Sequence, residues 1–146
     1  MMYICILCFL VYGWPLVASE CQLGWIQFGN KCYFFSSDSR TWVAASSVCR
    51  AHSAELVIID TEQENAFIAA EISKLTGEFW LDGTDQFLEG KWEWASTAQP
   101  FSYSNWYPGE PNDRNGEDCL ITNDFHNSYW TDVACTRLQT YICERR

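Results

Sequence analysis

Six cysteines between residues 21 and 143 constrain the fold of this chain more than any other feature. An even number of cysteines in a domain of this size is typical of a secreted protein in which every thiol is paired. They predict three disulfides, and no spacing among them resembles the paired Cys-x-x-Cys of a zinc site. Counting alone leaves the pairing open. The six positions are Cys21, Cys32, Cys49, Cys119, Cys135 and Cys143.

The N-terminal segment supports an extracellular location. Residues 1–19 contain no charged side chain, and the run from Tyr3 to Val17 is nearly all apolar. Small residues precede Glu20, which predicts a signal peptide cleaved after Ser19. A transmembrane anchor is the alternative, but the apolar run is shorter than the roughly 20 residues that a span needs. Two further cysteines, Cys5 and Cys8, would leave with the signal peptide.

The remaining sequence fits one acidic domain, residues 20–146. Removal of 19 of the 146 residues leaves 127, enough to bury a core of its own. The formal net charge of −10 disfavours nucleic acid and anionic membranes as partners, because both repel an acidic surface. Cations are the natural partners of such a chain.

Hydrophobic patterns predict helices in the first half and short strands in the second. Residues 40–51 form a helical stripe, and Thr61 to Glu64 form a capping box that opens a second helix ending at Gly77. Its apolar face would carry Ile68, Ile72 and Leu75. Strands are expected at 30–36, 79–81, 91–94, 119–122, 129–130 and 140–143, with a short buried run at 56–59. This order predicts an α+β fold.

A long loop, residues 95–118, follows the strand expected at 91–94 and ends in a dense group of oxygen ligands. Glu110, Asp113, Glu117 and Asp118 lie in one short segment with Arg114 as the only base. Like charges so close repel one another, and calcium prefers carboxylate and amide oxygens. The segment therefore predicts a calcium site, with a solvated acidic turn as the alternative. Long irregular loops in compact domains usually serve function.

These features together resemble the C-type lectin domain over essentially all of the mature chain. Four motifs in order carry the resemblance: the cysteine framework of the long form, Phe79–Gly83 where the family has Trp-Ile-Gly-Leu, the Glu110-Pro111-Asn112 tripeptide of mannose-type members, and Tyr129–Asp132 where the family has Trp-Asn-Asp. The resemblance implies a fold of two helices, antiparallel sheets and a long calcium-binding loop. It also implies the pairs Cys21–Cys32, Cys49–Cys143 and Cys119–Cys135, and a cis bond before Pro111.

The resemblance further implies two calcium sites and one sugar site. The primary ion and the sugar would share Glu110, Asn112, Glu117, Thr131 and Asp132, and an auxiliary ion would use Asp85, Glu89, Asp113 and Asp118. Thr131 departs from the family, which has Asn at this position. An amide can coordinate the ion through oxygen and donate to a sugar hydroxyl through nitrogen, whereas one hydroxyl cannot do both through separate atoms.

The expected function is that of a secreted, extracellular, calcium-dependent lectin for mannose-type glycans, microbial or on cell surfaces. It looks like the small recognition and agglutinating lectins of innate immunity, for which a homo-oligomer would supply avidity. An enzyme is disfavoured, because no acid in an apolar pocket accompanies the paired carboxylates. A lectin-like domain that binds protein or mineral without sugar is the alternative. His52 and His126 show no ligand spacing and are interpreted as structural.

Overall fold

The computed structural model describes residues 21–125 and 128–146. The predicted signal peptide, including Cys5 and Cys8, and also His126 lie outside the described residues. The elements of the described part follow one another along the chain in this order: β1 (Ile26–Phe28), β2 (Lys31–Phe35), α1 (Trp42–Ala51), β3 (Glu55–Leu56), α2 (Glu62–Ile72), β4 (Glu78–Thr84), β5 (Glu93–Trp94), β6 (Gln99–Pro100), β7 (Cys119–Asn123), β8 (Trp130–Val133) and β9 (Thr140–Arg145).

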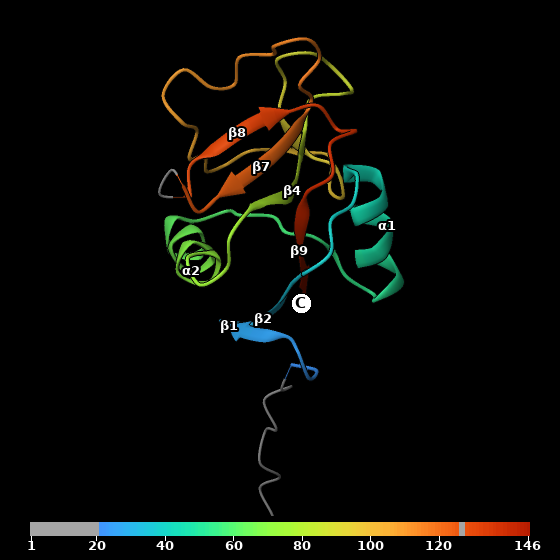
Figure 1. The fold of residues 1–146 in the computed structure, drawn as a ribbon, viewed down its shortest axis with the longest axis vertical. Helices are drawn as coiled ribbons and strands as arrows, with labels where there is room; N and C mark the ends of the chain where they lie inside the picture. The colour runs from blue at the N-terminus through green and yellow to red at the C-terminus, as the bar shows by residue number, and fades with distance from the viewer. Residues whose placement is uncertain (1–20, 126–127) are drawn as a thin grey trace, which may run out of the picture.

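Strand β9 lies at the centre of the sheet, between β2 and β4. It pairs antiparallel with β2 and β3 but parallel with β4, where Phe79 lies opposite Thr140 and Trp80 opposite Tyr141. The expected antiparallel pairing is present elsewhere in the sheet, and this pair differs from it. A parallel pair needs a long connection, and β5 to β8 together provide it. Figure 1 shows α1 and α2 on opposite sides of this centre, with the loops of residues 85–118 gathered at the top.

Both helices begin at a threonine cap. Thr41 accepts a hydrogen bond from the amide of Ala44, and Thr61 accepts one from the amide of Glu64. The predicted stripe of α1 is confirmed, since Trp42, Ala45 and Cys49 are buried. The helix ends at His52, whose backbone amide donates to the carbonyls of Cys49 and Arg50.

Helix α2 ends earlier than the sequence predicts. The expected end at Gly77 is wrong, because the helix stops at Ile72 and Leu75 is 40% exposed. The amide of Leu75 donates to the carbonyl of Ile72, three residues back, which tightens the last turn and breaks the 3.6-residue stripe. Ile68 and Ile72 are buried as predicted.

A buried ion network joins β2, α2 and β9. Lys31 Nζ lies 2.7 Å from Glu64 Oε1 and 2.9 Å from Glu144 Oε2. The hydroxyl of Tyr33 donates to the same Glu64 oxygen at 2.6 Å, and burial raises the pKa of Tyr33. Glu55 lies directly opposite Glu144 in the β3–β9 pair. Like charges in that position destabilise a sheet, so Lys31 is required to offset them.

The disulfides join the elements that the resemblance implied. The pairs are Cys21–Cys32, Cys49–Cys143 and Cys119–Cys135. The second closes a loop of 94 residues between α1 and β9. Restricting the unfolded chain over that separation is worth about 4–5 kcal/mol in the chain-entropy description.

Asp82 is an unexpected charge in the interior, at the middle of β4. Its side chain is 1% exposed, and it stands inside the motif that departs from the family pattern. Burial raises the pKa of Asp82 to about 7, although hydrogen bonds from Ser96 favour the charged form. Both of those bonds end on one carboxylate oxygen, Oδ2, at 2.8 Å from the Ser96 amide and 2.6 Å from its hydroxyl.

This geometry predicts that Asp82→Asn stabilises the protein at high pH only. A raised carboxyl pKa in the folded state means that stability falls as pH rises from about 4 to about 7, and the full cost stands above pH 7. Asparagine removes the charge and keeps one oxygen to accept both Ser96 bonds. Urea unfolding in a chelator should show a gain of a few kcal/mol at pH 8 and little change at pH 4. An equal gain at both values would contradict the prediction.

Candidate functional site

Trp130 in β8 supports the long loop from below. The side chain is fully buried, and its ring packs edge-on against those of Trp94, Phe101 and Trp106. Its backbone is bonded to the loop as well: the amide of Trp130 donates to the carbonyl of Asn105 at 2.8 Å, and its carbonyl accepts from the amide of Tyr107 at 2.9 Å. The start of the acidic segment is therefore fixed to the core.

The tripeptide that follows contains a cis peptide bond between Glu110 and Pro111. A cis bond brings the flanking residues closer than a trans bond does. The side-chain nitrogen of Asn112, Nδ2, donates to Glu110 Oε2 at 2.5 Å, so the two side chains lie together. The cis bond implied by the resemblance is present.

Asp132 of β8 holds this tripeptide from the other side. Its carboxylate is 3% exposed and accepts the backbone amide of Asn112 at 3.0 Å and that of Asp113 at 2.8 Å. The structure thus brings together Glu110, Asn112 and Asp132, which lie up to 22 residues apart in the chain.

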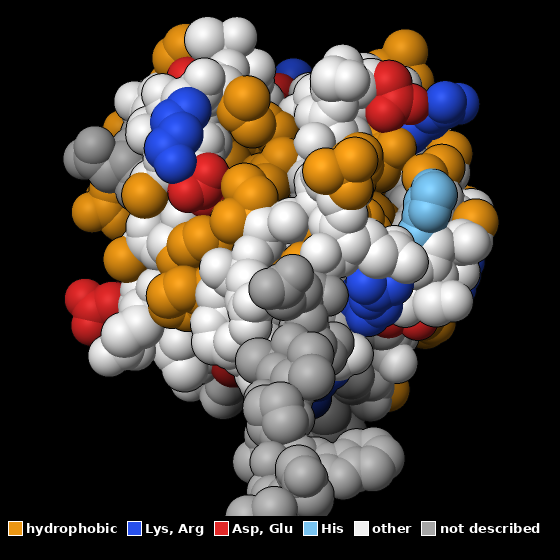
Figure 2. Space-filling view, turned by 90° about the horizontal axis from the view of Figure 1, so that it is seen from below, with side chains coloured by type: hydrophobic (Ala, Val, Ile, Leu, Met, Phe, Trp, Pro, Cys, Tyr) orange, Lys and Arg blue, Asp and Glu red, His pale blue; other side chains and the backbone are white. Residues whose placement is uncertain are grey.

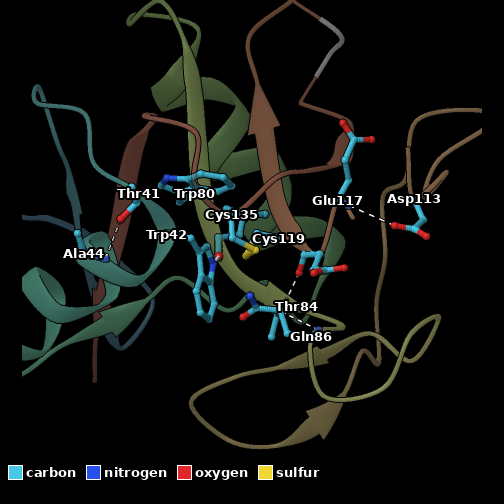
Figure 3. Close-up of a disulfide and its surroundings, with 12 residues drawn as sticks. Thr41, Trp42, Ala44, Trp80, Thr84, Gln86, Asp113, Glu117, Cys119 and Cys135 are labelled. Carbon is cyan, nitrogen blue, oxygen red and sulfur yellow. Dashed lines mark hydrogen bonds between the residues drawn. A yellow bond between two sulfur atoms is a disulfide. The ribbon is translucent and has the colours of Figure 1, made fainter. Parts of the chain in front are cut away.

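Glu117 joins the group through the turn between them. The backbone amide of Arg114 donates both to Asn112 Oδ1 at 3.1 Å and to Glu117 Oε2 at 3.3 Å. Glu117 in turn donates its own amide to Asp113 Oδ1 at 3.2 Å, a bond drawn in Figure 3. Backbone amides, rather than the guanidinium of Arg114, therefore offset part of the crowded charge in this segment.

Thr131 is the predicted residue that the structure connects least to the others. It lies opposite Ile121 in the β7–β8 pair and is half-buried. Among the hydrogen bonds between described residues, none joins its hydroxyl to the other four predicted ligands.

The charges in this first group are costly without a cation. Burial, followed by the neighbouring carboxyl of Asp132, raises the pKa of Glu110 to about 7, although the hydrogen bond from Asn112 acts in the opposite direction. The negative charge of Glu117 acts in the same direction as burial. A positive ion at this point would relieve the repulsion.

A second acidic group lies beneath the first. Oxygens of Asp85, Glu89 and Asp118 all lie within 4.8 Å of one another. Burial and the charge of Asp118 raise the pKa of Asp85, and burial followed by the charge of Asp85 raises that of Glu89. Asp113 was predicted here too. It falls outside that close group, although its charge also acts on the pKa of Glu89.

One oxygen in this group has no hydrogen-bond partner in the described part of the chain. Asp85 is 3% exposed, its Oδ2 accepts the amide of Gly90 at 2.9 Å, and its Oδ1 is buried and unpartnered. A buried carboxylate oxygen without a donor is unfavourable. The all-oxygen donor set suits a hard cation such as calcium, so the residues present fit an ion.

Sequence reasoning missed the residue that joins the two acidic segments, Thr84. Its hydroxyl donates to the backbone carbonyl of Asp118 at 2.7 Å and accepts from the amide of Gln86 at 3.1 Å. Figure 3 shows Thr84 close to the Cys119–Cys135 disulfide. A threonine immediately before a predicted ligand was the available signal.

The family is settled by comparison with known proteins. Residues 38–145 match the family model described as the lectin C-type domain. The chain therefore belongs to the C-type lectins, a family of non-enzymatic proteins, and it is no enzyme. Homologues in the family bind carbohydrates, and its domains generally bind calcium.

Individual relatives share the fold over most of the chain. A perlucin-like protein of Mytilus galloprovincialis is 35% identical over 85% of this chain and 82% of its own length. The carbohydrate-recognition domain of the mouse scavenger receptor C-type lectin superposes with a TM-score of 0.81 at 30% identity, covering 86% of this chain and 96% of that one. The corresponding domain of cow CD23, solved in the presence of GlcNAc2Man3 oligosaccharide, gives 0.79 at 33% identity, covering 86% and 95%.

The domain also occurs within longer proteins. The chain spans 54% and 62% of the lengths of two other curated relatives. Within the described residues, neither helix has the length and apolar character needed to cross a bilayer.

The acidic groups predict that calcium stabilises the fold. A ligand that binds only the folded state raises its stability by mass action, so calcium at 10–100 times Kd should raise Tm by roughly 4–10 °C. A chelator should reverse the shift. Asp85→Asn should reduce the shift, whereas the exposed control Glu62→Gln, which removes the same charge, should retain it. A Tm that does not change when calcium is added would exclude both ion sites.

Proposed function

We propose that this protein is a secreted, calcium-dependent lectin for mannose-type glycans. The observation that carries the proposal is the hydrogen bond from Asn112 Nδ2 to Glu110 Oε2, which places an amide and a carboxylate side by side next to the buried Asp132. The three disulfides support secretion, because such bonds persist in oxidising compartments.

The primary ligands would be Glu110, Asn112, Glu117, Thr131 and Asp132, with Asp85, Glu89, Asp113 and Asp118 around an auxiliary ion. A bound calcium ion would supply attraction for lone pairs of two neighbouring sugar hydroxyls. Glu110 and Glu117 would each accept a hydroxyl proton, because ionised carboxylates only accept. Asn112 would donate through its side-chain nitrogen, which now donates to Glu110.

This arrangement of acceptors and donors favours vicinal equatorial hydroxyls, as in mannose, glucose or N-acetylglucosamine. A site of this kind is small and wet, so affinity for a single sugar is weak and avidity must come from several domains together. Recognition of microbial or cell-surface glycans in innate immunity is the biological role that we propose. A lectin-like domain that binds protein or mineral is the competing function, and Thr131 in place of asparagine is the residue that favours it.

Chromatography on mannose-agarose tests the proposal. The protein should be retained in calcium and released by a chelator. Glu110→Gln combined with Asn112→Asp exchanges the acceptor and donor positions, and it should shift retention from mannose towards galactose. Glu62→Gln serves as the control for surface charge. Retention on neither sugar, in a protein whose Tm still rises with calcium, would favour the competing function.

Thr131 provides the sharpest test of the primary site. Thr131→Asn should add an amide donor beside the sugar, and a hydrogen bond at a charged centre is worth about 1.5–3 kcal/mol, or roughly ten-fold or more in affinity. Calorimetry should show tighter calcium and mannose binding for Thr131→Asn, and weaker calcium binding for Thr131→Ala. If both variants match the natural protein, residue 131 does not face the ion.

A further inference from the structure

A second pocket lies apart from the proposed sugar site, between α1 and the middle of β4. Its volume is about 200 Å³, and its lining includes Asp82, Trp42, Phe87, Glu55 and Arg50. The proposed lectin function uses none of these side chains. The face seen from below in Figure 2 carries basic and acidic side chains interspersed with apolar ones.

Asp82 gives this pocket one carboxylate oxygen that accepts no hydrogen bond from a described residue. The side chain is 99% buried, being 1% exposed, and it lines the pocket. Both bonds from Ser96 end on Oδ2, so Oδ1 has no donor among the groups that the structure describes. A buried carboxylate is stable only when its oxygens are paired with donors or a cation. Oδ1 is therefore available to a donor that enters the pocket.

The chain's nearest cation does not fill that role. Arg50 lines the same pocket, but the salt bridges between described residues are formed by Lys31, Arg40, Lys74 and Arg137. Meanwhile the charges of Glu55 and Glu144 act on Asp82 and raise its pKa. Acidic groups thus outnumber the one base around this carboxylate, which disfavours an anionic ligand.

We propose that this pocket binds the primary ammonium group of a small organic molecule, with Asp82 as the counter-ion. An ammonium supplies three donors and a full charge, and charge-assisted bonds are about twice as strong as neutral ones. A neutral hydroxyl supplies one donor. The rings of Trp42 and Phe87 also line the pocket, and aromatic faces attract cations. The site works independently of calcium and goes beyond the proposed sugar binding.

Binding at this site depends on pH. Asp82 is faced by Arg50 from α1, by Glu55 from β3, by Glu144 from β9 and by the uncharged Ser96 after β5. Burial raises the pKa of Asp82 to about 7, so an ammonium ion must displace a proton from it below that value. Affinity therefore rises between pH 6 and pH 8 and levels off above, provided that the amine itself stays protonated.

Amide NMR titration of the whole mature domain in a chelator tests the proposal. Cyclohexylammonium is the probe, because its amine stays charged through this range, and cyclohexanol is its neutral match. Saturable shifts at the amides of Ala95 and Ser96 are expected with the first and none with the second. Nα-acetyl-lysinamide distinguishes the source: tighter binding than cyclohexylammonium would point to a protein lysine, and weaker binding to a free amine. Equal binding of cyclohexanol would overturn the proposal.

Three variants complete the test. Asp82→Asn should weaken cyclohexylammonium binding by about ten-fold or more, and Arg50→Gln should strengthen it by about two- to five-fold by removing a repulsive charge. Glu62→Gln, which changes the net charge equally at an exposed position in the first turn of α2, should leave binding unchanged. Unaltered affinity in folded Asp82→Asn, or weaker binding in Arg50→Gln, would overturn the assignment. The Arg50 and cyclohexanol results decide the matter even if Asp82→Asn fails to fold.

Discussion

The packing of Trp130 is the constraint on which the functional half of this domain depends. One buried indole contacts aromatic rings from several segments, and its nitrogen donates to Asn65 of α2 at 3.0 Å. The backbone of the same residue is bonded to Asn105 and Tyr107. A loop of more than twenty residues loses much conformational entropy when it is ordered. Burial of aromatic surface against Trp130 is the contribution that offsets this loss.

The loop so anchored concentrates charge that the fold can hold only in part. Asp132 accepts two backbone amides, and the amide of Arg114 bridges Asn112 and Glu117. These bonds fix the positions of the carboxylates but leave their mutual repulsion. In the second acidic group, the unpartnered oxygen of Asp85 likewise carries negative charge that no described donor offsets. The same short segment therefore fixes the positions of the carboxylates and creates the repulsion between them that a bound cation would relieve.

Much of the architecture could be predicted from the sequence, because the decisive signals were local. The Thr61 cap and the stripe of α1 each depend on residues close together in the chain, and both are confirmed. Long-range features were different. The parallel pairing of β4 with β9 and the early end of α2 depend on packing between distant segments. In the capping box, one carboxylate oxygen of Glu64 accepts hydrogen bonds from Lys31 and Tyr33. The other accepts the amide of Asp60 rather than that of the cap residue Thr61. Of the predicted ligands, Asp113 and Thr131 were the least determined, since loop conformation and strand orientation decide where their oxygens point.

The central position of β9 has a consequence for biosynthesis. Its neighbours β2 and β4 leave the ribosome long before residues 140–145 do, and Cys49 must wait for Cys143. Until then the nascent chain exposes two unpaired strand edges and at least one reduced thiol, with Cys32 close by in sequence. Non-local pairings of this kind form slowly. Folding of the domain should therefore be completed slowly, because both halves of the sheet require this last strand.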